Sequence, residues 1–131
     1  MTEPIYITQA KRTPIGTFGG SLSRMATIDL GTHLAKALIE SSGVSADQFD
    51  SAVWANVVTT IPRDNYTSRA VSLEAGMPQS SHAYGVNRLC GSGVQAIISA
   101  AQQLITGDAK LSIAGGVEVM SQAPYSVDGM R

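Results

Sequence analysis

The chain has 131 residues, 44% of them hydrophobic, which suits a single globular domain with a core of its own. Its nine basic and ten acidic residues are scattered, which excludes the basic surface of a nucleic-acid-binding protein. No apolar run approaches the ~20 residues that cross a bilayer, and Glu3 and Pro4 do not resemble the start of a signal peptide. We therefore expect a cytoplasmic protein without membrane contact.

Charged residues make up only 15% of the chain, below the roughly 25% that is typical of soluble proteins. This low charge predicts hidden surface, inside a larger protein or in an extensive oligomer. Cys90 is the only cysteine, so a disulfide within the chain is excluded. His33 and His82 lie far apart without ligands at metal-binding spacing, so we do not expect a metal site. We expect no bound cofactor either.

The first half of the chain predicts strand, helix and strand. Residues 4–8 are expected to form a strand, which is followed by a glycine-rich loop. Apolar residues at helical spacing predict a helix over 28–42 with Thr27 as its N-cap. Residues 51–58 mix apolar and polar side chains, as in a strand that lies inside a sheet and is covered on both faces.

The second half continues this alternation. We expect a helix over 68–75, a strand over 83–87, a helix over 94–105 and a strand over 109–114. The helix over 94–105 is apolar nearly all round, which predicts burial on several sides. The order βαβαβαβ with short connections predicts a layered α/β fold with a mostly parallel sheet.

Cys90 stands at the C-terminal end of the third predicted strand, directly before this apolar helix. Functional groups in such sheets lie beyond the C-terminal ends of the strands, and the N-terminus of a helix favours a thiolate. Cys90 is therefore a candidate nucleophile, whose own N–H could face an oxyanion and whose neighbours Gly91 and Gly93 allow close approach. The chain offers no obvious base, because His82 lies at the far end of the strand.

The same residues support two other interpretations. A lone cysteine is commonly a small buried hydrophobic residue. The pattern Gly91-x-Gly93-x-x-Ala96 also matches a dinucleotide-binding loop, although its acidic partner would be Asp108, which lies in a turn rather than at a strand end. A cofactor- or protein-binding module without catalysis therefore stays open at this point.

Three runs of residues resemble the N-terminal part of the thiolase family. They are AKRTPIG at 10–16 with FGG at 18–20, NRLCGSG at 87–93, and GGVEVMSQAP at 115–124. The first is similar to the opening segment Ala-x-Arg-Thr-Pro-x-Gly, and the second is similar to the acyl-cysteine signature. The run PRDNY at 62–66, with Arg69, is more similar to the β-ketothiolase branch.

The resemblance implies a layered thiolase-like α/β fold, with residues 1–120 as an incomplete N-terminal domain and residues 121–131 as the start of an inserted loop domain. It implies that Cys90 takes an acyl group from acetyl-CoA or a 3-ketoacyl-CoA as a thioester. The acyl group then passes to CoA or to a second acetyl-CoA. The rest of a thiolase chain would supply a histidine, a second cysteine and an oxyanion segment, so the 131 residues alone are expected to be inactive.

Further expectations follow from the same resemblance. Acyl-CoA and CoA would be the partners in fatty acid metabolism, and residues 81–89 would contribute to a homodimer or homotetramer. Asn87 would position the turn at Cys90, while Glu118 and Met120 would support the site through buried contacts. A ketoacyl-synthase-like condensing enzyme remains the alternative of the same fold, and residues that bind the substrate are not identified.

Overall fold

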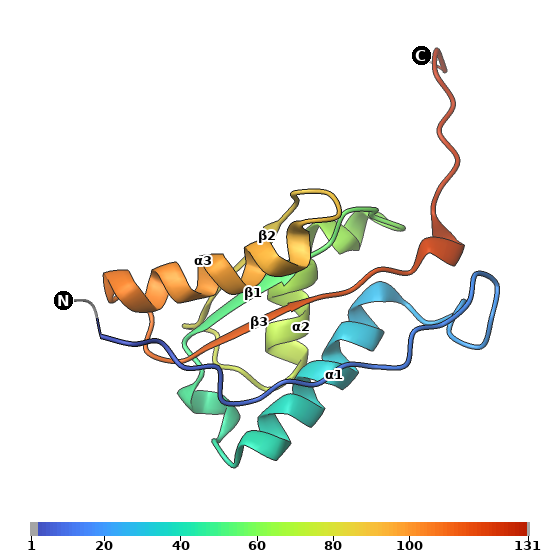
Figure 1. The fold of residues 1–131 in the computed structure, drawn as a ribbon. Coiled ribbons are helices and arrows are strands. Elements are labelled where there is room, and N and C mark those ends of the chain that lie inside the picture. Colours follow the sequence, from blue (N-terminus) through green and yellow to red (C-terminus); the bar gives the residue numbers. More distant parts are fainter. Residues whose placement is uncertain (1–2, 131) are drawn as a thin grey trace.

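A computed structural model describes residues 3–130 and contains three α-helices and three strands within that range (Figure 1). Three short 3-10 helices complete the structure. In chain order the elements are α1 (Thr27–Ser42), η1 (Ala46–Gln48), β1 (Ser51–Ala55), η2 (Pro62–Tyr66), α2 (Thr67–Glu74), β2 (His82–Val86), α3 (Ser92–Thr106), β3 (Ser112–Gly116) and η3 (Met120–Gln122).

The strands form one parallel sheet in the order β2-β1-β3. The central strand β1 is buried at all five positions, which confirms the prediction that this strand lies inside the sheet. Alternate residues of β1 face opposite sides: Ala52 and Trp54 pack with the core under α1 and α2, whereas Val53 and Ala55 pack with α3. Figure 1 shows the three layers that result, and the predicted α/β class is confirmed.

The first predicted strand is absent, so the sheet has three strands rather than four among the described residues. Residues 3–16 form neither helix nor strand, and no backbone hydrogen bond joins them to another described segment. A strand needs a partner to complete its ladder. Further along the segment, Lys11 to Thr13 and the β3 residues Ile113 to Gly116 line a cavity of about 270 Å³.

The prediction of a helix buried on several sides after the cysteine is also wrong for the described residues. Only Ser92, Ala96, Ser99 and Ala100 of α3 are buried. The opposite side of this helix exposes Val94, Ile97, Ile98 and Ile105. The reason is that the sheet covers a single face of α3, and no other described element packs on the remaining faces.

Two carboxylates bind backbone groups where strands are predicted, so the observed strands have different ends. The side chain of Asp50 accepts hydrogen bonds from the N–H of Lys110 at 2.9 Å and of Leu111 at 3.1 Å, so β3 begins only at Ser112. At the other end of the sheet, Glu118 binds the N–H groups that follow Ala55, so β1 ends there and not at residue 58.

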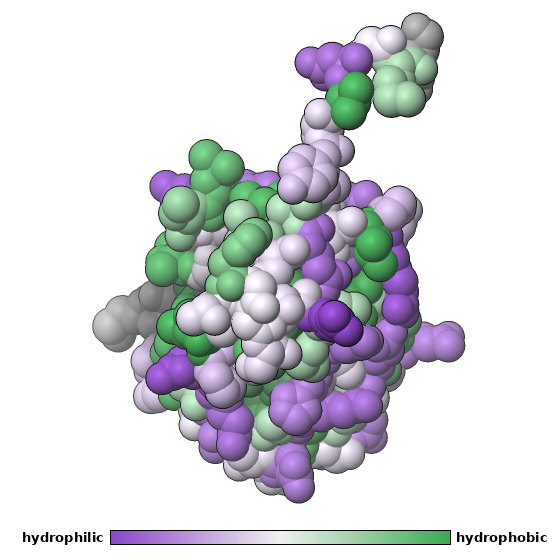
Figure 2. Space-filling model, turned by 90° about the vertical axis from the view of Figure 1, so that its right-hand side faces the viewer, coloured by the Kyte–Doolittle hydropathy of each residue, from purple (hydrophilic) through white to green (hydrophobic). Residues whose placement is uncertain are grey.

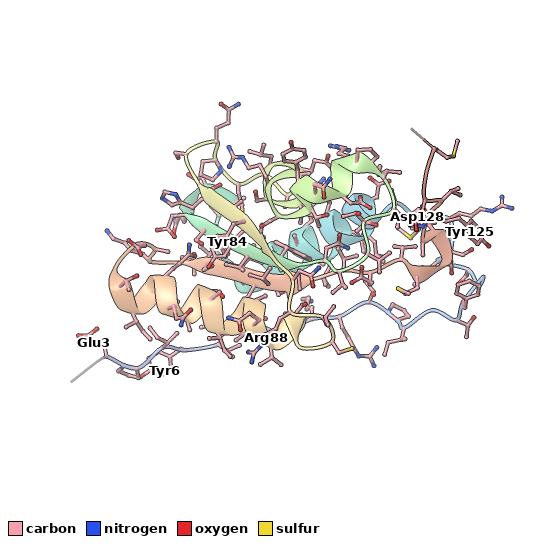
Figure 3. All side chains as sticks on the ribbon, turned by 90° about the horizontal axis from the view of Figure 1, so that it is seen from above. Glu3, Tyr6, Tyr84, Arg88, Tyr125 and Asp128 are labelled. Atoms are coloured by element: carbon pink, nitrogen blue, oxygen red, sulfur yellow. The ribbon has the colours of Figure 1, made fainter. Side chains whose placement is uncertain are left out.

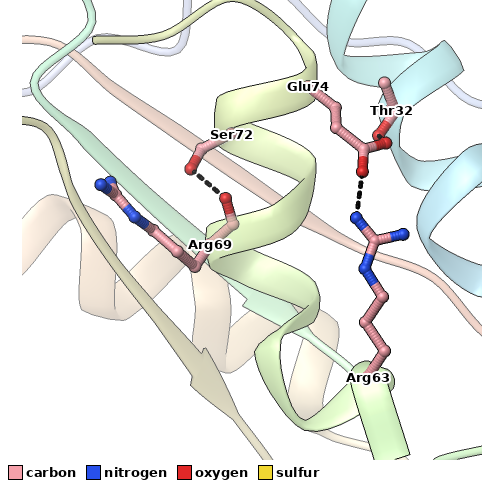
Figure 4. Close-up of polar contacts among 5 residues, drawn as sticks. All are labelled: Thr32, Arg63, Arg69, Ser72 and Glu74. Carbon is pink, nitrogen blue, oxygen red and sulfur yellow. Dashed lines mark hydrogen bonds and ion pairs between the residues drawn. The ribbon is translucent and has the colours of Figure 1, made fainter. Parts of the chain in front are cut away.

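Arginine side chains of α2 and the preceding turn attach this helix to its surroundings. Arg63 forms an ion pair with Glu74, whose second oxygen accepts a hydrogen bond from Thr32 of α1 at 3.3 Å (Figure 4). Arg69 lies on another side of the helix and donates to the carbonyl oxygens of Ser81 at 2.8 Å and Gln79 at 2.7 Å. The two hydrogen bonds of Arg69 fix the segment that leads into β2.

The segment after β3 is attached to the loop before α1 and then leaves the body of the molecule. Ser121 accepts a hydrogen bond from the Gly19 N–H at 2.9 Å, and Gln122 donates to the carbonyl oxygens of Ser23 and Met25. Beyond Gln122 the chain projects outward (Figures 1 and 2). The division into domains at residue 120 stays a prediction. Within residues 3–130, the helices are too short or too polar to cross a membrane.

Candidate active site

Cys90 lies in the turn that joins β2 to α3, on the side of the sheet where the C-terminal ends of all three parallel strands lie. Its thiol is exposed and comes two residues before the first residue of α3. The turn therefore presents the thiol to solvent at the N-terminus of a 15-residue helix, as the sequence predicts.

Side chains at both ends of this turn hold its shape. The Leu89 N–H donates to Asn87 Oδ1 at 3.1 Å, which confirms the predicted role of Asn87 in positioning the turn. Ser92 Oγ accepts from the Arg88 N–H at 2.7 Å and donates to the Leu89 carbonyl oxygen at 2.6 Å. These bonds enclose Cys90 on both sides without using its sulfur.

Leu89 has a backbone φ of +49°, in the left-handed region that residues with a side chain rarely adopt. Such a conformation costs on the order of 1–3 kcal/mol and persists only where the surroundings enforce it. The hydrogen bonds of Asn87 and Ser92 supply that enforcement. The residue directly before the candidate nucleophile is thus held in a rare conformation, and no sequence pattern predicts this.

The two glycines after Cys90 have different surroundings. A methyl group added to Gly91 would lie 3.4 Å from the carbonyl oxygen of Arg88, at the short end of ordinary van der Waals contact. A methyl group on Gly93 would meet no atom within 4 Å. The space beside Gly93 is therefore open, while Arg88 extends along α3 and donates to Gln95 at 2.9 Å (Figure 3).

Neither histidine stands beside Cys90. His82 is the first residue of β2, at the opposite end of the strand from the thiol, and His33 is exposed on α1, which packs on the other face of the sheet from α3. Within residues 3–130, no cluster of metal-binding side chains is present. The described chain thus provides a thiol and a turn but no histidine that could act as its base.

The loop after β1 is held by two carboxylates, of which only Glu118 is expected at the site from the sequence. Glu118 binds the start of the loop through the N–H groups of Val57 and Val58. Asp64 binds its end, accepting from the Thr60 N–H and hydroxyl, both at 2.7 Å, and from the hydroxyl of Thr27 at 3.3 Å. Thr27 therefore does not cap α1 as predicted, because its hydroxyl is used by Asp64.

Glu118 and Met120 do not make the buried contacts expected of them. Both residues are exposed, and Met120 is 53% accessible. They line a cavity of about 360 Å³ together with residues 13–18. The contribution of Glu118 is the set of hydrogen bonds to the loop after β1, which it makes at the surface.

The surroundings of Asp64 lower the pKa of its carboxyl group. Burial raises this pKa and is the largest single effect, but the combined hydrogen bonds from Thr60, Ile61 and Thr27 outweigh it. A carboxyl whose pKa is lower in the folded state stabilises the fold above its unfolded pKa, and this stabilisation is lost as the pH falls through the folded value.

We expect Asp64→Asn to lower the free energy of unfolding by about 1–3 kcal/mol at pH 7, because a buried charged acceptor of several hydrogen bonds is lost. The difference between the variant and the original protein should shrink as the pH falls below about 4, the usual value for aspartate. Urea unfolding of both proteins at pH 7 and at pH 3 measures this. A difference that stays constant across this range would contradict the role of the charge.

The fold agrees with comparisons to known proteins. Residues 5–131 match the model of the thiolase N-terminal domain, and the chain therefore belongs to the thiolase family. It is 43% identical over 131 residues to beta-ketothiolase BktB of Cupriavidus necator, covering 33% of that protein. It is 39% identical over 127 residues to human mitochondrial 3-ketoacyl-CoA thiolase, of which it covers 32%.

Solved structures give the same result. The chain superimposes on human mitochondrial 3-ketoacyl-CoA thiolase in complex with CoA with a TM-score of 0.90 and 40% identity, covering 92% of this chain and 31% of that one. An acetyl-CoA acetyltransferase of Bacillus anthracis gives a TM-score of 0.84 at 35% identity. The chain thus spans about a third of the length of the thiolases that it matches.

Proposed function

We propose that the complete protein carrying this sequence is an acyl-CoA C-acyltransferase of the thiolase class, with Cys90 as its nucleophile. The observation that carries this proposal is the exposed thiol in a turn fixed by Asn87 and Ser92, at the N-terminus of α3. The thiolase relatives add the substrate class, since one of them is solved in complex with CoA.

The proposed reaction has two acyl transfers. In the direction of thiolysis, the Cys90 thiolate attacks the keto carbon of a 3-ketoacyl-CoA, and the bond between C2 and C3 breaks. The electron pair of that bond, with one proton, ends on C2 of the released acetyl-CoA, while the acyl group stays on sulfur as a thioester. The CoA thiol then attacks the thioester, loses its proton and releases Cys90. Condensation of two acetyl-CoA molecules runs these steps in reverse.

Groups outside the described chain would move the protons. Both steps need a group that accepts and returns a proton, and His82 is at the wrong end of β2. We expect a histidine and a second cysteine from the rest of the protein. The 131 residues alone should therefore show no appreciable turnover.

We further propose that the protein forms a homodimer or homotetramer through residues 81–89. Support comes from β2, which is an edge strand and leaves Tyr84 40% exposed (Figure 3). An unpaired edge is a ready partner for another strand. Cytoplasmic location, a place in fatty acid metabolism and the absence of a cofactor other than the CoA substrates remain predictions.

Mass spectrometry of the complete protein after incubation with acetyl-CoA tests the proposed function. We expect one acetyl group on the peptide that contains Cys90, and none in Cys90→Ala. Acetylation at another residue would contradict the proposal. Acyl loading from acyl carrier protein but not from CoA would instead identify a ketoacyl-synthase-like enzyme, and binding of a dinucleotide without acylation would indicate a binding module.

A further inference from the structure

A single carboxylate connects the C-terminal ends of two strands, on the side of the sheet where Cys90 lies. Glu118, two residues after β3, accepts hydrogen bonds from the N–H of Val57 at 3.0 Å and of Val58 at 2.8 Å. It also accepts one from the side-chain amide of Asn56 at 2.9 Å. All three donors belong to the loop that leaves the central strand β1, so the start of this loop is fixed by one side chain.

These bonds leave the Asn56 amide only one orientation. Its Nδ2 donates to Glu118 and, at 3.0 Å, to the carbonyl oxygen of Val117. Neither acceptor can donate a hydrogen bond in return, so nitrogen and not oxygen must face them. The amide oxygen of Asn56 therefore faces away from the segment after β3. It is buried and has no hydrogen-bond partner among residues 3–130, an arrangement that costs free energy.

The register of the parallel strands places this loop next to the turn at Cys90. Ala55 is the register partner of Val86, so Asn56 and Asn87 are the first residues beyond the paired ends of neighbouring strands. Such strands lie about 4.8 Å apart. Asn87 in turn accepts the Leu89 N–H that shapes the turn before the thiol. The loop that Glu118 holds therefore leaves the strand next to the one that leads into this turn.

We propose that Glu118 is a positioning residue for acyl transfer at Cys90 and acts through the start of the loop after β1, which it holds at Asn56, Val57 and Val58. Glu118 does not reach the thiol, because β1 lies between β3 and the strand that leads to Cys90. Its carboxylate keeps the loop after β1 in one conformation, and this loop follows the C-terminal end of the strand next to β2. The inference rests on the proposed function, since it concerns the rate of the same reaction.

Glu118→Gln in the complete protein tests this role. Glutamine keeps the size of the side chain and one oxygen, but it turns an NH₂ group toward the N–H donors of the loop. We expect the rate constant for acetylation of Cys90 by saturating acetyl-CoA to fall roughly 10- to 100-fold, the usual effect of a small misplacement of reacting groups. The concentration of acetyl-CoA that gives half the maximal rate should change much less. Quenched samples analysed by mass spectrometry give both quantities.

Asp50→Asn is the matched control. Asp50 also accepts two backbone N–H bonds through its carboxylate, but it does so at the end of the sheet opposite to Cys90. We expect this variant to lose a similar amount of thermal stability while its acetylation rate stays within about twofold of the original. In addition, Asn56→Ala combined with Glu118→Gln should slow acetylation by less than the product of the two single losses, because both substitutions release the start of the same loop.

The outcomes separate this inference from the proposed function. An acetylation rate that is unchanged in Glu118→Gln, or lowered equally in Asp50→Asn, would overturn the positioning role and leave Cys90 as the nucleophile. Fully additive losses in the double variant would also overturn the route through the loop after β1. If the original protein itself is not acetylated at Cys90, the proposed function fails first.

Discussion

Serine in place of Cys90 is expected to lower the rate of acyl transfer about a thousandfold or more in the complete protein. A serine hydroxyl is a poor nucleophile near neutral pH unless a base is placed beside it to take its proton. The described chain has His82 at the far end of β2 and His33 on another layer, so neither can serve. The substitution changes one atom and leaves the bonds of Asn87 and Ser92 to the turn in place.

The measurement is the loss of acetoacetyl-CoA in the presence of CoA, followed for both proteins at the same concentration. Circular dichroism and the thermal midpoint serve as controls, and both should stay close to those of the original protein, because the side chain at this position is exposed. A serine variant within tenfold of the original rate would show that another group attacks the substrate.

Trp54→Ala is expected to lower the free energy of unfolding by about 3–5 kcal/mol, the largest effect on stability that we expect of a single substitution here. Trp54 lies in the central strand and is only 2% exposed. A methyl group on Gly115 would lie 3.0 Å from its ring, and one on Gly31 would lie 3.5 Å away. The ring therefore fills the space between α1 and the sheet, and its removal leaves a cavity that these neighbours cannot close.

Urea unfolding of the complete protein, followed by circular dichroism, tests this prediction. Trp54→Phe is the graded control, since it keeps an aromatic ring of smaller size and should cost clearly less than alanine. A loss below about 1 kcal/mol for the alanine variant would mean that Trp54 does not organise the core.

The sequence predicts the sheet best where burial decides the structure. The mixed apolar run at residues 51–58 predicts the central parallel strand, and the predicted helix ends at residues 42 and 105 agree with α1 and α3 to within one residue. The apolar residues at 4–8 carry the same local pattern but no ladder. Whether a strand forms there depends on a partner edge, and a local pattern carries no information about a partner.

The candidate site could be predicted only in part for a similar reason. The position of Cys90 and the role of Asn87 follow from a strand, a turn and a helix that are adjacent in the chain. Glu118 and Asp50 act on backbone groups about 60 residues away, and this pairing exists only after the sheet is formed. The left-handed conformation of Leu89 is likewise enforced by its surroundings, because leucine itself disfavours it.

The strand order β2-β1-β3 also has a consequence for synthesis on the ribosome. The central strand is made first, but its two neighbours end only at Val86 and Gly116. At roughly 5–20 residues per second, synthesis from the end of β1 to the end of β3 takes about 3–12 s, and only then can β3 pair with the second edge of β1. During that interval, Ala52 to Trp54 are not yet buried in a complete sheet. We therefore expect a ribosome-associated chaperone to bind the nascent chain at this apolar run.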